Sequence, residues 1–411
     1  MGSSSAIDPA LRAGLRTLRD PATIRDRCGH ILAAAQAGES PNFTINRTAL
    51  DTVAERVARL TRQRFPDLLI PYHSRWRHFE VGGVDRRAEL ARMLAGRDRA
   101  AVARAQIELA LVSVLLDAGA GPDWRYVERH GQSGYARSEG LAVASFRAFT
   151  DGAFSSDPRE PCRVDAAALL RIDAAALGRI FQVGIDNPLV GLEGRAALLQ
   201  RLGAELQRRP EWFTAEGRPG QLFDLLTATP PVTASAILLS LLDAFSGIWP
   251  SGQSFHGLPV GDAWPHPATG GSGLDAGWVP FHKLSQWLTY SLLEPFEWAG
   301  VPVAGLDALT GLPEYRNGGL LLDGGVILPR DAAFAARPRR PDEPWVIEWR
   351  ALTVALLDEL APRVRELLSV PGLPLACILE GGTWAAGREI AAELRPGGAP
   401  PLTIASDGTV F

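Results

Sequence analysis

Apolar residues recur at steps of three and four along most of this chain, and this spacing limits the fold it can adopt more than any other feature. Such a period places apolar side chains on one face of a helix, whereas a strand needs strict alternation. Residues 99–118 are apolar nearly all round, so we expect a buried central helix that ends at Gly119 and Gly121. The other predicted helices lie at residues 23–36, 48–65, 139–149, 165–181, 192–208, 234–245, 281–296 and 345–368.

Strand signals are scarce. Residues 319–328 read GLLLDGGVIL, and the Asp-Gly-Gly sequence at positions 323–325 predicts a β-hairpin turn. Gly and Pro are dense in residues 250–277, which favours a long inserted loop, and helical spacing continues on both sides of it. We therefore predict a mainly α fold with a small β element. A flexible N-terminus of residues 1–20 would precede a single large helical domain over residues 21–411.

The composition narrows the class of partner. Of the 411 residues, 46% are apolar and 21% are charged, which is typical of a globular protein. A formal charge of -4 gives no basic surface for nucleic acid or an anionic membrane. No run approaches the roughly 18 apolar residues of a membrane span, and the N-terminus lacks the apolar stretch of a signal peptide. We expect a cytoplasmic protein with a small-molecule substrate.

Several kinds of site have no signature in the sequence. Cys28, Cys162 and Cys377 lie far apart and outside any C-x-x-C pair, which argues against a disulfide framework or a zinc cluster. G-x-G-x-x-G, G-x-x-x-x-G-K-[ST], H-E-x-x-H and G-x-S-x-G motifs are all missing. We predict neither a metal nor an organic cofactor.

Lys283 is the one lysine among 42 cationic residues, and it lies in the apolar, aromatic segment VPFHKLSQWLTY. Arginine serves wherever a surface cation only has to be charged, whereas lysine supplies a compact, rotatable ammonium group. A strongly biased composition also leaves stray lysines, but the apolar setting favours a functional one. Gln286 lies three residues later, on the same face of the predicted helix.

Two polar clusters precede this segment. In PYHSRWRHF, His73, Arg75 and Trp76 are suited to stacking a ring and binding hydroxyls, and a hydrogen-bonded structural loop is the alternative. In GYARSEGLA, Glu139 stands in the first turn of a predicted helix. A carboxylate there is favoured by the helix dipole alone by roughly 0.3–1 kcal/mol, so Glu139 fits capping as well as substrate binding.

Candidate carboxylates lie in three further segments. Asp186 stands in FQVGIDNPLVG, where an Asx-Pro turn needs no function, but the apolar neighbours predict a partly buried turn. Asp262 and Trp264 lie together in the long loop, the setting that a cationic or sugar-like transition state needs, although an exposed loop carboxylate is the commoner case. A third segment gathers an acid, a phenol and a guanidinium, for which a salt-bridged turn is the alternative. Its residues are Glu314, Tyr315 and Arg316.

These motifs resemble two families. F-x-K-x-x-Q at 281–286, L-T-x-x-x-x-Y-R at 309–316 and T-W-A at 383–385 resemble the queuosine salvage nucleosidases, helical N-glycoside hydrolases akin in fold to DNA glycosylases. GYARSEGLA, FQVGIDNPLVGLEGR and LTGLPEYRNGGLL are similar to a family tied to uracil catabolism in fungi and bacteria and described as of unknown function. This second resemblance covers nearly the whole chain. Glu314 stands where the salvage enzymes have Asp, which indicates a different leaving group.

The resemblance implies a helical N-ribosyl hydrolase that splits a ribosylurea-type or nucleoside-type substrate. Members have been labelled uracil phosphoribosyltransferases, but the acidic, Gly/Thr-rich phosphate loop of such a transferase is missing from the sequence. Cleavage of a ribosyl C–N bond needs a carboxylate near the anomeric carbon and help for the leaving nitrogen. Asp262 or Asp186 is the candidate for the first role and Glu314 for the second, with Lys283 holding a substrate oxygen. The alternative is a binding protein that senses a nucleoside or urea derivative without catalysis.

Overall fold

A computed structural model describes residues 8–117, 119–128, 134–249 and 252–405. It confirms a mainly helical fold with small antiparallel two-stranded sheets. The chain divides into two compact units, each assembled from segments far apart in the sequence. Among the described residues, unit 1 takes in those of 8–72, 252–286 and 306–405, and unit 2 takes in those of 73–249 and 287–305. The single helical domain over residues 21–411 stays a prediction, because compactness alone does not establish which parts fold independently.

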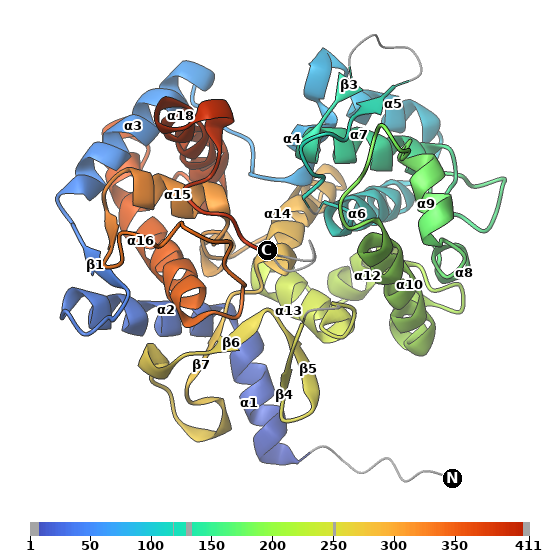
Figure 1. The fold of residues 1–411 in the computed structure, drawn as a ribbon. Coiled ribbons are helices and arrows are strands. Elements are labelled where there is room, and N and C mark those ends of the chain that lie inside the picture. The colour runs from blue at the N-terminus through green and yellow to red at the C-terminus, as the bar shows by residue number, and fades with distance from the viewer. Residues whose placement is uncertain (1–7, 118, 129–133, 250–251, 406–411) are drawn as a thin grey trace. The chain divides into compact units, whose positions relative to one another are not determined.

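Unit 1 has long helices and most of the strands (Figure 1). Helix α14 begins in unit 1, and the boundary between the units falls after Gln286 within it. The elements of unit 1 are α1 (Pro9–Arg19), α2 (Pro21–Gln36), β1 (Phe43–Ile45), α3 (Ala49–Arg64), β4 (Gln253–Phe255), β5 (Leu258–Gly261), β6 (Ala263–Pro265), η3 (Pro267–Thr269), η4 (Gly273–Asp275), β7 (Trp278–Pro280), α14 (Lys283–Trp298), η5 (Leu306–Ala308), α15 (Tyr315–Asp323), β8 (Ile327–Pro329), α16 (Pro344–Leu368), α17 (Leu375–Ile378), the π-helical turn η6 (Leu379–Thr383), α18 (Trp384–Leu394) and η7 (Pro396–Gly398).

Helix α16 is the centre of unit 1, where α2 and α3 both pack against it. Its buried face carries large apolar side chains, and Leu352 and Leu356 are fully buried. The predicted helices at 23–36, 48–65 and 345–368 are thus confirmed. The local 3.6-residue period was sufficient for them, because the buried faces are continuous.

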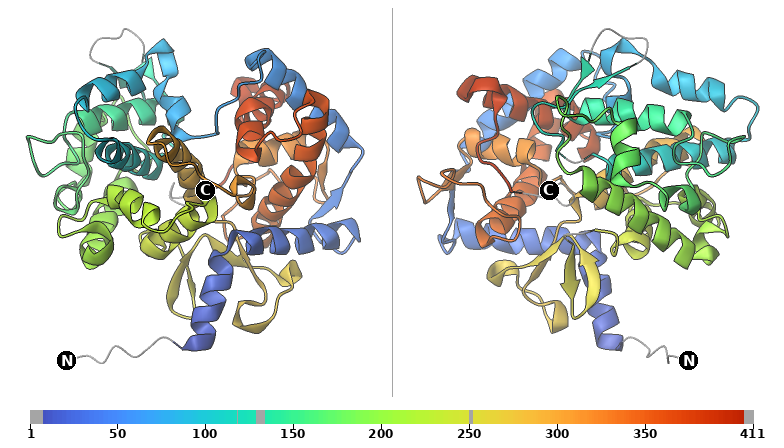
Figure 2. Two further views of the ribbon diagram at one scale, coloured as in Figure 1. Left: turned by 180° about the vertical axis from the view of Figure 1, so that it is seen from behind. Right: turned by 45° about the vertical axis from the view of Figure 1, so that its right-hand side comes forward.

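The N-terminal prediction needs a correction. Residues 1–20, predicted as flexible, contain helix α1, whose first turn is capped by Asp8 through Ala10 N (2.8 Å). Leu18 of α1 packs against Phe255, Val260 and Ala263, so the helix is held by β4, β5 and β6. Figure 2 shows α1, in dark blue, beside these yellow strands.

Two β predictions were wrong. Residues 319–328 do not form a hairpin: positions 315–323 are helix α15, and β8 pairs with the distant strand β1 through Ile45↔Ile327. The Asp-Gly-Gly sequence ends a helix here, a role that suits glycine as well as a turn does. Residues 252–277 are not an irregular loop, because β4 and β5 form a hairpin and β6 pairs with β7. The hairpin turns at His256 and Gly257, both with positive φ (47° and 83°), as a type I′ turn requires.

The described part of unit 2 is mainly helical, with a short strand pair formed by β2 and β3 (Figure 1). Helix α6 is buried along most of its length, as predicted, but it ends at Leu115, before the glycines expected to stop it. The elements of unit 2 are α4 (Arg75–Phe79), η1 (Val81–Gly83), α5 (Arg86–Met93), α6 (Arg99–Leu115), β2 (Tyr126–Val127), β3 (Gly134–Tyr135), α7 (Arg137–Thr150), α8 (Ala166–Leu169), α9 (Ala174–Ile180), α10 (Leu192–Arg208), α11 (Pro210–Phe213), η2 (Pro219–Gln221), α12 (Leu222–Thr227), α13 (Ala234–Phe245) and the part of α14 from Trp287.

The helices predicted at 139–149, 192–208 and 234–245 are confirmed as α7, α10 and α13. The segment 165–181, predicted as one helix, is two. Asp165 caps α8 through Ala168 N (3.0 Å), and Asp173 caps α9 through Ala176 N (2.7 Å). The second cap starts a new helix, because an aspartate side chain that accepts a backbone N–H replaces the helical bond at that position.

Candidate functional site

Asp262, between β5 and β6, is the centre of a hydrogen-bonded group in unit 1. Its Oδ1 and Oδ2 accept the two N–H groups of the Arg350 guanidinium, each at 2.7 Å. The indole Nε1 of Trp264 donates to Oδ1 (2.7 Å), and the backbone N of Lys283 donates to Oδ2 (3.0 Å). The carboxylate is therefore fully engaged, and it joins β6, α14 and α16.

The Asp262 carboxylate is ionised at neutral pH. Burial alone would raise its pKa, but the charge and hydrogen bonds of Arg350 outweigh burial and lower the pKa to about 2. Arg350 is itself buried on α16, and its guanidinium lies 4.2 Å from the centre of the Phe281 ring. A carboxylate held in this way orients its neighbours, and it does not exchange protons near neutral pH.

The start of α14 is fixed by the same aspartate. The backbone N–H groups of Phe281 and His282 donate to the carbonyl oxygen of Asp262 (2.9 and 3.1 Å). His282 has a positive φ of 47°, is buried, and places its Nε2 2.8 Å from the carbonyl oxygen of Leu18. Burial lowers the pKa of His282. A left-handed non-glycine residue just before Lys283 is backbone strain of the kind that collects at functional sites.

Gln286 connects α14 to the segment before α15. Its Nε2 donates to Thr310 Oγ1 (2.7 Å) and to the carbonyl oxygen of Phe281 (3.0 Å). In return, the backbone N of Thr310 donates to Gln286 Oε1 (2.9 Å). Gln286 is fully buried, and its amide bonds protein groups on both segments, while its predicted role in substrate binding stays a prediction.

Glu314 caps helix α15. Its Oε1 accepts the N–H of Asn317 (2.6 Å) and its Oε2 accepts the N–H of Arg316 (2.7 Å). Glu314 is half-buried, and Tyr315, which follows it, is 38% exposed. The guanidinium of Arg316 lies 4.7 Å from the centre of the Tyr315 ring. An acid and a phenol thus stand together at a surface of unit 1.

A second group of predicted residues lies in unit 2. Arg75 is fully buried and donates through Nε to Ser113 Oγ (2.7 Å), and its Nη1 lies 3.2 Å from Asp117 Oδ1. Burial lowers the pKa of Arg75, while the charges of Asp117 and Glu139 oppose that shift. Glu139 stands in the first turn of α7, as predicted. Arg75 and Glu139 therefore belong to one electrostatic group.

The neighbours of Arg75 have structural contacts. Trp76 is buried and its Nε1 donates to the carbonyl oxygen of Ser291 (2.9 Å), which matches the alternative of a hydrogen-bonded structural loop. His73 is also buried.

The prediction for Asp186 needs a correction. Leu189 is buried, but Ile185 is 96% exposed and Asp186 is exposed as well, so the carboxylate is not in the buried part of the turn. The turn is built by Asn187, whose side chain bonds the backbone of Arg125 and Gln182. An exposed carboxylate in such a turn lacks the buried setting on which its catalytic role depended.

Sequence reasoning missed Arg350 and left Thr310 out of the candidate residues. Arg350 stands with Glu348 in the otherwise apolar stretch WVIEWRALTVALL, and both side chains are buried. Charged residues at buried positions of a predicted helix were the available signal, because such charges need partners. Within the described residues, no group of three or more His, Cys, Asp or Glu side chains is placed to hold a metal ion. None of the described helices has the length and apolar character that crossing a membrane requires.

Comparison with known proteins identifies similar sequences. A family model described as a protein of unknown function, DUF1688, matches residues 17–411. The chain is 42% identical over 410 residues to "Protein urg3" of Schizosaccharomyces pombe, covering 97% of this chain and 98% of that protein. It is 39% identical over 409 residues to "Uracil catabolism protein 4" of Lachancea kluyveri, covering 91% and 93%. These similarities extend over both units.

Proposed function

The chain belongs to the DUF1688 family of proteins of unknown function, and we propose on this basis that it acts in uracil catabolism, the process named for its Lachancea kluyveri relative. The alignment with the Lachancea kluyveri protein covers 91% of this chain and therefore includes both units. The proposed process is accordingly assigned to the whole chain. Within that process we further propose an N-ribosyl hydrolase. Its substrate would be a ribosylurea-type or nucleoside-type compound.

The Gln286–Thr310 hydrogen bonds are the observation that carries the hydrolase proposal. They join the first turn of α14, which begins at Lys283, to the segment that reaches Glu314 four residues later. Lys283 and Glu314 are both half-buried. The backbone of each residue is held by its segment, and the end of each side chain can reach solvent. A cation and an acid on adjoining segments suit a polar substrate that has to lose a nitrogen group.

The proposed reaction is hydrolysis of the C1′–N bond. Water adds its oxygen to C1′, the C1′–N bond breaks, and the proton released by water passes through Glu314 to the leaving nitrogen. The two backbone N–H groups at the start of α15 fix the position of the Glu314 carboxylate. Lys283 binds a hydroxyl or ureido oxygen, and Asp262 positions Lys283 through its backbone N–H.

The test is turnover by the full chain. We would incubate it with ribosylurea, its 5′-phosphate, uridine and queuosine, and follow urea, base and ribose by mass spectrometry. Glu314→Gln should lower the rate by roughly a hundredfold or more, the usual contribution of a general base. Glu366→Gln, at an exposed position of α16, is the matched control and should keep the wild-type rate. Wild-type activity in Glu314→Gln would refute the assigned role.

A second candidate is a binding protein without catalysis. The low pKa of Asp262 favours it. A catalytic acid or base needs a pKa of about 5–8 to gain and lose a proton at neutral pH, and the pKa of Asp262 is about 2. In that case a ribosyl compound should raise the melting temperature of the chain while mass spectrometry detects no product. Urea or base release would exclude this candidate.

A further inference from the structure

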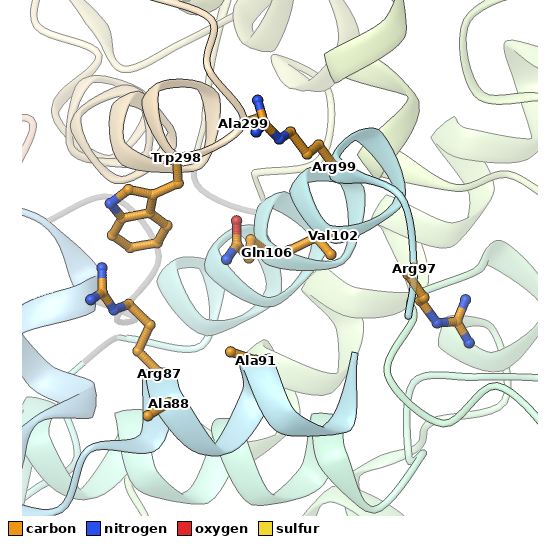
Figure 3. A pocket seen from close by; sticks show the side chains of 9 residues that line it. All are labelled: Arg87, Ala88, Ala91, Arg97, Arg99, Val102, Gln106, Trp298 and Ala299. Atoms are coloured by element: carbon orange, nitrogen blue, oxygen red, sulfur yellow. The ribbon is translucent and has the colours of Figure 1, made fainter. Parts of the chain in front are cut away.

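A pocket of about 410 Å³ opens in unit 2, lined by α5, α6 and the end of α14 (Figure 3). This volume is at the lower end of the roughly 300–1,000 Å³ typical of small-molecule sites. Its polar lining comes from Arg87, Arg97, Arg99, Gln106 and Trp298. None of these residues belongs to the group around Asp262, so the pocket extends beyond the proposed function.

The charged residues that line the pocket are all cationic. Three arginines line it, and no acidic residue does. Arg97 is paired with Glu160 (3.2 Å), and Arg87 lies over the Trp298 ring, 4.7 Å from its centre. Among the described residues no carboxylate pairs with Arg87 or Arg99, and both side chains are exposed. Two guanidinium groups are therefore available to an anion.

Gln106 adds an amide to the pocket. Only 7% of this residue is exposed. Arg99, Val102 and Gln106 share one face of α6, and in Figure 3 the amide of Gln106 points into the pocket. An amide that lines a pocket offers both donors and an acceptor to a hydrogen-bonding ligand or to water.

We propose that this pocket binds a phosphorylated ligand of the size of a sugar phosphate. Two guanidinium groups match the charge of a phosphate dianion, and the Gln106 amide suits a hydroxyl. The Trp298 ring already has two partners within the protein. Arg87 covers one face, and Trp76 packs edge-on at 4.8 Å with a 75° angle between the rings. A ligand without an aromatic ring is therefore favoured over a nucleotide.

Calorimetric titration at low salt tests this proposal without any need for turnover. The probes are ribose 5-phosphate, inorganic phosphate, ribose and uridine 5′-monophosphate. Ribose 5-phosphate should bind most tightly, and ribose should not bind. Arg87→Gln and Arg99→Gln should each weaken ribose 5-phosphate binding roughly tenfold or more, the effect of losing a charge-assisted hydrogen bond. Gln106→Leu should weaken it as well.

Arg201→Gln is the matched control, because Arg201 is an exposed arginine of α10 outside the pocket. It should bind like the wild type. Equal binding of ribose and ribose 5-phosphate would overturn the anion site, as would Arg87→Gln and Arg99→Gln variants that bind like Arg201→Gln. Tighter binding of the nucleotide than of the sugar phosphate would overturn the assigned ligand class. Because Arg87 and Arg99 are exposed, both variants are expected to fold, which circular dichroism verifies.

Discussion

The buried pair Asp262–Arg350 gives the sharpest prediction about unit 1. Its two 2.7 Å bonds engage both carboxylate oxygens, and both residues are buried. Arg350→Met removes the cation but retains a long, flexible side chain, and Asp262→Asn removes the anion but retains the shape. Each single variant leaves one buried charge without its main partner. The double variant leaves none.

The expected magnitudes follow from that difference. Removing one partner of a buried ion pair costs about 3–5 kcal/mol, because the remaining charge stays desolvated. The double variant should lose much less than the sum of the two single losses. We expect a coupling of about 2–3 kcal/mol in the free energy of unfolding, at the upper end for residues in direct contact.

The pH dependence gives a second measure of the same pair. The pKa of Asp262 is about 2 in the folded chain, below the roughly 3.9 of an unfolded aspartate. A depressed pKa contributes stability that is present above pH ~4 and is lost as the pH falls through about 2. The contribution is about 2.5 kcal/mol. Without Arg350 the pKa rises, and this part of the acid sensitivity should disappear.

Urea denaturation followed by circular dichroism measures both effects, at pH 7 and at pH 3. Free energies of unfolding from the four proteins give the coupling at each pH. Additivity within about 0.5 kcal/mol at pH 7 would refute the reasoning. An Arg350→Met variant with the acid sensitivity of the wild type would refute the assigned cause of the low pKa.

Two further predictions concern packing and hydrogen bonding in unit 1. A Cβ at Gly387 would clash with the backbone carbonyl oxygen of Arg316, so Gly387→Ala should lower the melting temperature and cost about 1–3 kcal/mol in urea denaturation. Gly29→Ala on α2 is its control, since nothing lies within 4 Å, and it should stabilise by up to about 1 kcal/mol. Gln286→Leu leaves the buried N–H of Thr310 without its acceptor, so it should lower the free energy of unfolding by about 1–3 kcal/mol. An unchanged midpoint of urea denaturation would contradict a stabilising role of this hydrogen bond.

Local signals predicted most helices and failed where a distant partner decides the structure. The buried faces of α3 and α16 repeat every three or four residues, so their spacing was sufficient. The Asp-Gly-Gly sequence at 323–325 is compatible with a hairpin turn and with a helix end. What decides between them is the pairing of Ile327 with Ile45, a strand partner about 280 residues earlier that no local pattern reveals.

In the candidate site, too, local sequence predicted some residues, and contacts between distant segments decided the others. Lys283 and Gln286 stood out because their residue types are unusual in an apolar helix, and the structure connects both to neighbouring segments. Arg350 lies 88 residues from Asp262 in the sequence, so the pair is purely tertiary. Asp186 failed for the opposite reason. Two apolar neighbours were taken as a sign of burial. Leu189 is buried, yet Ile185 is exposed, as single surface apolar residues often are.

The two carboxylates of the unit 1 group differ in what they are able to do. Asp262 accepts from a guanidinium, an indole and a backbone N–H, so its charge is balanced and its oxygens are committed. Glu314 accepts two backbone N–H groups at the start of α15 and is half-buried, whereas Asp262 is buried. An oxygen that takes a proton from water has to be within reach of water. If unit 1 carries hydrolytic chemistry, Glu314 is therefore its base, and Asp262 acts on the reaction only by holding Lys283 in place.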